Sequence, residues 1–346
     1  TLKLSGFGEG SELDNVLSGK GTIVLDNSHV NVTGENSELQ AAWSVNANSH
    51  LLAEGNVLSH IGSGTIALSG GATFADNGSW TLSNVLTGEG ELFVSAGSRA
   101  NVFAFGQTNT GFIGDITLSN LIFQLSGNQT NNAQTIAGTD LTLVDAILNV
   151  STAYTDDQLK SLTSSSNSKI VFTDLTPWDS DCSGMNVGKV SALENGGVIS
   201  VNALTSTYSG AKNLTNTQLL HADNAGLIQA LINSKDAISG QFILAEAGEN
   251  GNVTQTVDIY NNLNESSVAK GTYEFKLIQD DHNIDLSYVL TQVDLSGVLQ
   301  LSTQEAADQA DKTLSAKVIG NGGLDIASGI VYLTNADNQY AGATGI

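Results

Sequence analysis

Pairs of neighbouring carboxylates are the residues of this sequence that come closest to a catalytic arrangement. Hydrolysis of a glycosidic bond needs two carboxyl groups that face each other across that bond. Asp156 with Asp157, and Asp179 with Asp181, can be nominated for this role. Both pairs lie in long polar stretches, where adjacent acids are more often solvated turn residues. A polysaccharide-cleaving enzyme is therefore an alternative hypothesis and not the main one.

The sequence contains few other residues in arrangements typical of catalytic sites. A serine hydrolase needs a nucleophile in a G-x-S-x-G turn with His and Asp partners, and this motif does not occur. A polysaccharide lyase needs cations beside the substrate acid, yet Arg99 is the single arginine. We predict no catalytic residues. The histidines follow no recognisable motif, and we expect most of them at solvent-exposed positions or at the edges of the coils: His29, His50, His60, His221 and His282.

Metal and cofactor motifs are also missing from the sequence. The single cysteine, Cys182, excludes an internal disulfide framework and a CxxC metal site. Acidic loops offer the oxygen ligands that calcium prefers, but no D-x-D-x-D-G loop or Gly-Asp nonapeptide array occurs. We predict neither a metal nor a cofactor.

Asparagines recur near corresponding corners of a repeating segment. Such amides commonly satisfy the backbone groups of buried corners. They can also form a polar face that pairs with the same face on another copy, where many weak hydrogen bonds act together. Both interpretations stay open here. The candidate self-association or ligand face comprises Asp76, Asn77, Asn101, Asn109, Asn128, Asn131 and Asn132.

The corners belong to a repeat that runs through most of the chain. One phrase, a Gly or Thr followed by alternating apolar residues, begins at Gly64, Gly90, Gly114 and Thr139. The intervals are 26, 24 and 25 residues (90−64, 114−90, 139−114). A constant interval in this range is typical of a solenoid. We interpret the glycine as a corner that accepts positive φ and the alternating residues as a strand. Related phrases begin at Gly21, Ala41, Ser168, Gly197 and Gly322.

A second alternating run follows most of these phrases, as at Val30–Val32, Leu121–Leu125 and Ala146–Val150. Two or three strands per turn, joined by corners rich in Asn, Ser and Gly, predict an all-β parallel β-helix. The crossover preference of parallel strands predicts a right-handed one. We expect roughly ten to thirteen turns that rise ~4.8 Å each.

The repeat breaks near Leu204. Apolar residues at helical spacing between Leu219 and Ile232 predict a short amphipathic helix. Strands are expected after it, with Asp280–Asn283 as a hairpin turn. We therefore divide the chain into β-helix at 1–204, a small inserted or appended α/β or β-rich subdomain at 205–290, and a β-helix continuation at 291–346. The expected strands are 242–245, 257–260, 273–278 and 284–293.

The charge balance limits the partners. Net charge is −23, with 12 Lys and Arg against 35 Asp and Glu. A nucleic-acid partner is excluded because no basic surface can release counterions from phosphates. An anionic membrane surface is disfavoured for the same reason. No stretch is long and apolar enough to predict a helix that spans a bilayer.

One C-terminal segment resembles a known family. Leu314–Leu324, followed by Val331–Thr344, resembles the passenger-associated repeat of bacterial autotransporters, G-x-G-x-L and then L-T-x-x-N-x-Y-x-G-x-T. Residues 108–116 echo the N-x-F-x-G-x-I phrase of the same family. The sequence differs by one extra residue before Tyr340.

The resemblance to self-associating, AIDA-like passengers implies export by type V secretion. It implies display on a Gram-negative outer membrane, or secretion after cleavage. The implied function is adhesion, aggregation and biofilm formation, with a role in virulence. The implied partners are copies of the protein on neighbouring cells, or a host extracellular-matrix protein or glycan. Membrane contact is implied only through a C-terminal barrel that this sequence lacks, so we expect a longer protein. The alternatives are a polysaccharide-binding or polysaccharide-cleaving β-helix and a stalk that presents another binding region.

Overall fold

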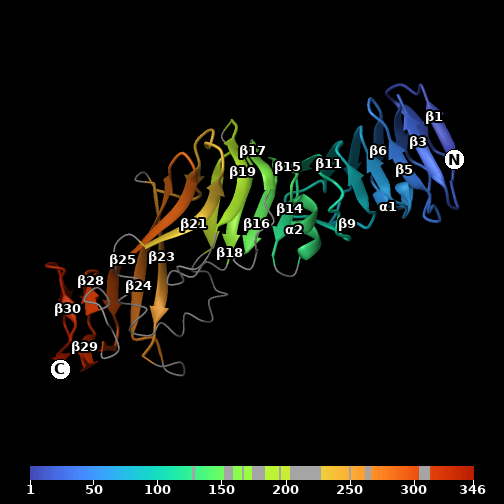
Figure 1. Ribbon diagram of the computed structural model, residues 1–346. Coiled ribbons are helices and arrows are strands. Elements are labelled where there is room, and N and C mark those ends of the chain that lie inside the picture. Colours follow the sequence, from blue (N-terminus) through green and yellow to red (C-terminus); the bar gives the residue numbers. More distant parts are fainter. Residues whose placement is uncertain are drawn as a thin grey trace. The chain divides into compact units, whose positions relative to one another are not determined.

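The protein is nearly all β, and its stacked parallel strands form a parallel β-helix, or β-solenoid, of about 13 turns over the residues that the structure describes (Figure 1). This computed structural model confirms the predicted fold class. The described residues are 1–126, 129–151, 159–165, 167–173, 184–194, 196–202, 227–248, 251–261, 266–303 and 312–346.

The chain divides into two compact units. The first comprises Thr1–Phe172, Met185–Ser200 and Ile232–Phe242. The second comprises Thr173–Gly184, Val201–Leu231 and Ile243–Ile346. The boundaries expected from the sequence, at 204 and 290, stay a prediction.

Three parallel sheets, here named A, B and C, form the walls of the described part of the first unit. Sheet A contains β1 (Leu2–Ser5), β3 (Thr22–Asp26), β5 (Ala42–Val45), β7 (Ile66–Leu68) and β10 (Leu86–Gly88). Sheet B contains β2 (Ser11–Leu13), β4 (His29–Val32), β6 (His50–Glu54), β8 (Gly71–Ala75), β11 (Glu91–Ser95), β13 (Asp115–Ser119), β15 (Asp140–Val144), β17 (Leu159–Ser165) and β19 (Met185–Ala192). Sheet C contains β9 (Trp80–Leu82), β12 (Val102–Phe105), β14 (Ile122–Leu125), β16 (Ile147–Ser151), β18 (Lys169–Thr173) and β20 (Val198–Asn202).

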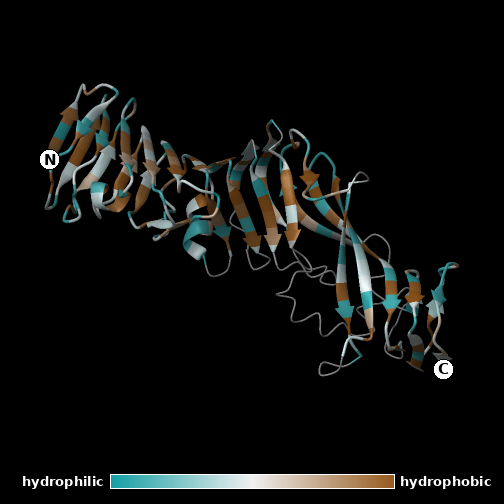
Figure 2. Ribbon diagram, turned by 180° about the vertical axis from the view of Figure 1, so that it is seen from behind, coloured by the Kyte–Doolittle hydropathy of each residue, from teal (hydrophilic) through white to brown (hydrophobic). Residues whose placement is uncertain are grey.

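Apolar residues alternate with polar ones along these strands, and Figure 2 shows the alternation as bands of brown and teal. Inward positions stack in register from turn to turn, as Leu92 does on Ile116 and Ile116 on Leu141. All three are buried. Phe103 and Phe105 pack edge to face with ring centroids 5.0 Å apart, an arrangement that aromatic quadrupoles favour. The core is therefore a set of aliphatic and aromatic ladders.

The glycines of the repeat are explained by close backbone approach. A Cβ atom on Gly90 would lie 2.0 Å from the carbonyl oxygen of Gly70, and one on Gly114 would lie 2.0 Å from that of Gly90. These glycines do not have the positive φ that the sequence analysis assumed. Left-handed corner positions are instead occupied by residues such as Asn120 and Asp145, with φ of 51° and 55°. The expected reason was therefore wrong for Gly90 and Gly114, whereas Gly21 does have a positive φ, of 138°.

The predicted register needs one correction. The phrase that begins at Gly64 lies on β7 of sheet A, whereas the phrases of Gly90 and Gly114 lie on sheet B. Ile66 pairs with Leu86. The strand that pairs with β11 in the preceding turn is β8. The strands of every sheet in a solenoid have the same alternation of apolar residues. Sequence spacing alone therefore did not predict which sheet each strand belongs to.

The helix predicted up to Ile232 is wrong where the structure describes it. Residues 227–234 form strand β21 (Leu227–Ser234), and Ile232 pairs in parallel with Met185 of β19. Both side chains are buried. Strand pairing and burial therefore override the helical spacing. Leu219 and Leu220 lie outside the described residues. In the described part of the first unit the chain also forms two helices that were not predicted, α1 (Val57–Ile61) and α2 (Thr130–Ile136).

The second unit contains the expected hairpin, formed by β24 (Ala269–Gln279) and β25 (Asn283–Leu295), and a further antiparallel pair that was not predicted. That pair is β23 (Asn252–Ile259) with β24. Asp280 forms the predicted turn, since its carboxylate accepts the backbone N–H groups of His282 and Asn283 at 2.7 Å each. These bonds lower the pKa of Asp280. The remaining described strands are β22 (Ile243–Leu244), β26 (Val298–Ser302), β27 (Thr313–Leu314), β28 (Lys317–Gly320), β29 (Gly323–Ser328), β30 (Tyr332–Leu333), β31 (Gln339–Tyr340) and β32 (Thr344–Gly345).

Parallel stacking resumes after the hairpins. β25 pairs with β28 and β28 with β31, while β26 pairs with β29 and β29 with β32. The segment that resembles the passenger-associated repeat therefore forms solenoid turns.

Candidate functional site

The outer face of sheet B carries two clefts that share His50. One, of about 410 Å³, lies over β2, β4 and β6. The other, of about 590 Å³, extends from His50 to Thr163. Because they share a residue, we treat them as one groove along the first unit, here named the sheet B groove. The wider cleft is lined by His50, Ala72, Thr73, Glu91, Leu92, Phe93, Asp115, Thr117, Asp140, Thr142, Ser161 and Thr163.

One row of outward side chains runs along the middle of the groove. Each residue pairs in register with the next, as Thr117 does with Thr142 and Thr142 with Thr163. Successive members are therefore ~4.8 Å apart, the spacing of neighbouring strands. The members from Asn31 to Ser191 are half-buried. This row, here named the central ladder, is Asn31, Leu52, Thr73, Phe93, Thr117, Thr142, Thr163 and Ser191.

A second row runs parallel to it, two positions earlier on each strand. In a strand these positions face the same side as the central ladder. This row, here named the charged ladder, is His29, His50, Gly71, Glu91, Asp115, Asp140, Ser161 and Lys189. Three consecutive carboxylates thus stand side by side on β11, β13 and β15.

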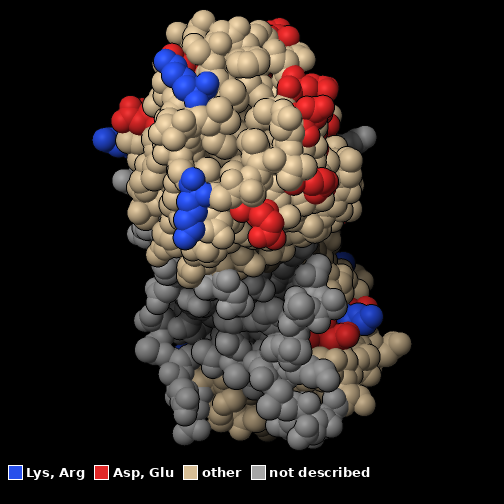
Figure 3. All heavy atoms as spheres, turned by 90° about the vertical axis from the view of Figure 1, so that its right-hand side faces the viewer, with Lys and Arg blue, Asp and Glu red and all other residues tan. Residues whose placement is uncertain are grey.

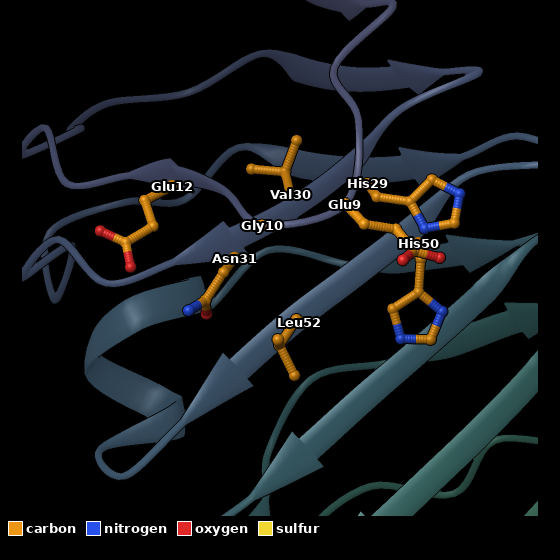
Figure 4. A pocket seen from close by; sticks show the side chains of 8 residues that line it. All are labelled: Glu9, Gly10, Glu12, His29, Val30, Asn31, His50 and Leu52. Carbon is orange, nitrogen blue, oxygen red and sulfur yellow. The ribbon is translucent and has the colours of Figure 1, made fainter.

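Histidines occupy one end of the charged ladder. The rings of His29 and His50 stack with centroids 6.1 Å apart and planes 13° apart, and Glu9 lines the same cleft (Figure 4). His50 Nε2 is 2.9 Å from Thr73 Oγ1. A Cβ atom on Gly71 would lie 2.5 Å from His50 Nδ1, so glycine leaves room for this ring. Burial, and then the nearby His29, lower the pKa of His50.

The neighbouring carboxyls Asp115 and Asp140 have opposite pKa shifts. Burial raises the pKa of Asp115, and the charge of Asp140 raises it further. Burial also raises the pKa of Asp140, but hydrogen bonds from Lys160 and Ser161 outweigh it and hold that pKa below its usual value. Lys160 forms an ion pair with Asp140, and Ser161 Oγ donates to Asp140 Oδ1 at 2.6 Å.

This arrangement suits binding better than bond cleavage. The two carboxyls of a glycosidase stand at least ~5 Å apart to leave room for the sugar or a water. Asp115 and Asp140 instead lie directly opposite on adjacent strands ~4.8 Å apart, close enough for each to shift the pKa of the other. Among the described residues, no cluster of three His, Cys, Asp or Glu side chains could hold a metal ion. The groove therefore offers hydroxyl and carboxylate groups for noncovalent contacts.

Three of the predicted contact residues lie in turns that connect sheet B to sheet C. Asn77 is exposed, and its backbone N–H donates to Asp76 Oδ1 at 2.7 Å. Asn101 donates its amide to the carbonyl of Ala96 at 2.7 Å. These residues stabilise their own turns.

Three others lie at a different corner, near α2. Asn109 and Asn132 are buried, and their amide oxygens accept the backbone N–H groups of Leu86 and Phe105 at 2.8 Å. Their side chains are therefore not presented to solvent. Asn131 is half-buried and bonds Thr108 Oγ1 at 2.8 Å. The structure does not bring the set together on one face, and a binding role of its exposed members stays a prediction. Asn128, Asp156, Asp157, Asp179 and Asp181 lie outside the described residues.

The sequence analysis missed both ladders of the groove. It also missed Asn84, which is buried in the same kind of corner as Asn109 and bonds the carbonyls of Gly62 and Gly64 at 3.0 and 2.7 Å. One signal was present. An acidic residue directly follows the glycine or threonine that begins three of the repeat phrases: Glu91, Asp115 and Asp140. Their identical position within the repeat was therefore a signal that they face the same side of the solenoid.

Fold and site together define a parallel β-helix with an open polar groove on one wall. Comparison with curated proteins finds the uncharacterized protein YuaQ of Escherichia coli strain K12, which is 26% identical over 355 aligned residues. The alignment covers 95% of this chain but 24% of YuaQ, so the chain spans about a quarter of that relative. No family model matches the chain, and no solved structure matches it. Within the described residues, no helix is long and apolar enough to cross a membrane.

Proposed function

We propose that this chain is the passenger region of a surface-displayed bacterial autotransporter and that it mediates adhesion, self-association and biofilm formation. The observation that carries the proposal is the sheet B groove, where polar ladders remain open to solvent over successive turns of one wall. The resemblance of residues 314–344 to the passenger-associated repeat supports the secretion route and the cell-surface location.

The repetition of the groove suits adhesion. A single hydroxyl contact contributes about 0.5–1.5 kcal/mol and a contact with a carboxylate about 1.5–3 kcal/mol, which is too little to hold a cell. Over successive turns the ladders present like groups side by side, namely the hydroxyls of Thr117, Thr142 and Thr163 and the carboxylates of Glu91, Asp115 and Asp140, so an extended partner makes several such contacts at once. Linked contacts raise the overall affinity without any single strong site.

The surface charge is compatible with this role. Figure 3 shows a face on which uncharged residues predominate and Asp and Glu gather mainly on one side. Only 14% of the residues are charged. The chain as a whole is therefore sparsely charged, and its acidic residues include the row on β11, β13 and β15 in the groove.

Cells that display the chain test the proposal. Replacing Thr117 and Thr142 by Arg fills the groove and is expected to abolish aggregation and surface attachment. The matched control replaces Ser44 and Thr87, on the outer face of sheet A, by Arg. Equal loss in both variants, or no loss in either, would contradict the groove as the contact surface. Unchanged adhesion after removal of the whole chain at preserved length would favour the stalk alternative.

A polysaccharide-cleaving enzyme is the second candidate. The opposite pKa shifts of Asp115 and Asp140 favour it, because such a split assigns acid and base roles to a carboxyl pair. The two groups must separate to admit a substrate. Incubation with a polysaccharide panel and an assay for new reducing ends tests this candidate, and the Asp140→Asn variant serves as the control.

A further inference from the structure

We propose that the sheet B groove binds an extended glycan of amino sugars, laid along the stacking direction with about one sugar ring over each strand. The inference rests on the proposed function and names the class of ligand. In this arrangement the hydroxyls of the sugars contact the central ladder, and their ammonium groups contact the charged ladder.

The repeat distance of the central ladder carries the first step. Thr117, Thr142 and Thr163 follow one another at the strand spacing of ~4.8 Å. An extended β-1,4-linked sugar chain advances by a similar length per ring, so each ring lies over a threonine hydroxyl, and every second ring presents the same edge because successive rings are turned over. Threonine hydroxyls both donate and accept hydrogen bonds, as the hydroxyls of sugars do.

Phe93 carries the second step. It lies in the central ladder between Thr73 and Thr117 and is half-buried in the wider cleft. An exposed aromatic face provides a flat apolar surface, and the C–H face of a sugar ring stacks on such a surface. This combination of one aromatic ring and a series of hydroxyls matches the alternating apolar faces and hydroxyl edges of a sugar chain.

The charged ladder carries the third step. Glu91 and Asp115 stand directly opposite on neighbouring strands, an arrangement of like charges that is unfavourable. Among the described residues, the ion pair on this ladder is that of Lys160 with Asp140. An ammonium group placed between Glu91 and Asp115 relieves their repulsion. The same carboxylates repel the uronic acids of an anionic glycan.

Calorimetry with the purified chain tests the proposal against four hexamers. These are glucosamine, glucose in β-1,4 linkage, galacturonate and lysine, at a pH where the amines are protonated. We expect the glucosamine hexamer to bind about tenfold more tightly than the neutral one, the ratio that one charge-assisted contact supplies. The galacturonate hexamer is expected not to bind. Equal or tighter binding of hexalysine would overturn the glycan assignment in favour of charge alone.

Two variants separate the two ladders. Glu91→Gln with Asp115→Asn removes the preference for glucosamine over glucose but leaves binding of the neutral hexamer. The double variant Thr117→Val with Thr142→Val is expected to weaken binding of both the glucosamine and the glucose hexamer. Ser44→Ala on sheet A is expected to change the affinity for neither hexamer. Thermal unfolding confirms that each variant is folded. If no hexamer binds although displayed cells still adhere through the groove, the ligand assignment fails and the proposed adhesion stands.

Discussion

Asp115 is a residue whose charge opposes folding. Its pKa is raised in the folded protein by burial and by Asp140, so its contribution to stability is present below the unfolded pKa and is lost as pH rises through the folded pKa. At pH 7 the ionised group therefore lowers the free energy of unfolding. We predict that Asp115→Asn raises this free energy at pH 7 by about 0.2–1 kcal/mol, the range of cross-strand charge pairs.

Urea unfolding at two pH values checks the prediction. The gain is expected at pH 7 and should vanish at pH 3, where the wild-type carboxyl is protonated. Asp140→Asn is the matched comparison. It is expected to destabilise at pH 7, because the pKa of Asp140 is lowered and Lys160 loses its partner. A gain for Asp140→Asn would contradict the assignment of the two environments.

His50 has the opposite dependence on pH. Burial and His29 lower its pKa, so the neutral ring contributes stability above the unfolded pKa of ~6.5, and this contribution is lost as pH falls through the folded value. We predict that acidification from pH 7 to 5 lowers stability less in His50→Gln than in the wild type. His29→Gln removes a nearby charge and is expected to raise the pKa of His50. Titration of the His50 ring by NMR measures that shift, and an unchanged pKa would contradict the coupling.

At the scale of the turn, the stacked glycines set the distance between successive corners. A Cβ atom on Gly114 meets the backbone of Gly90 at 2.0 Å, and backbone atoms of a packed solenoid have little room to move. We predict that Gly114→Ala lowers the free energy of unfolding by about 1–3 kcal/mol, as overpacking does. Gly78 is the control, because a Cβ atom there meets nothing within 4 Å. Similar effects of Gly114→Ala and Gly78→Ala on chemical unfolding would refute close approach as the reason for the glycine.

The elements also show what the sequence could predict. Apolar alternation and a constant interval predicted the strands and the solenoid, because every turn must bury the same kind of face. They did not assign strands to walls, since Ile66 and Leu92 carry the same local pattern on different sheets. The groove was missed because it depends on register. Glu91, Asp115 and Asp140 are distant in sequence, and only strand pairing makes them neighbours.

The buried corner asparagines illustrate a second limit. Asn109 was placed at a corner from its spacing, but whether its amide points inward depends on the backbone groups that surround it. Leu86 supplies a buried N–H that needs an acceptor. The need arises only after the turns have stacked, so local sequence could not separate a structural amide from a surface one.

At the scale of the whole molecule, a net charge of −23 governs encounters between copies. Two chains of like charge repel at low ionic strength, and salt screens this repulsion with a Debye length of ~8 Å at 0.15 M. We therefore predict that cells displaying the chain aggregate more at 0.15 M salt than in dilute buffer. Sedimentation of cell suspensions over a salt series measures the effect.

Binding of an amino-sugar chain should respond to salt in the opposite direction. Its ammonium groups are attracted by Glu91 and Asp115, and screening weakens that attraction. The affinity of the glucosamine hexamer is thus expected to fall over the same salt series in which aggregation rises, while the neutral hexamer changes little. The Glu91→Gln and Asp115→Asn double variant reduces the salt dependence of glucosamine binding but leaves that of aggregation, because a change of two charges alters −23 only slightly. If aggregation and the affinity for the glucosamine hexamer instead change in the same direction as salt increases, a single effect of surface charge explains both. That result would contradict a separate role of the charged ladder in binding.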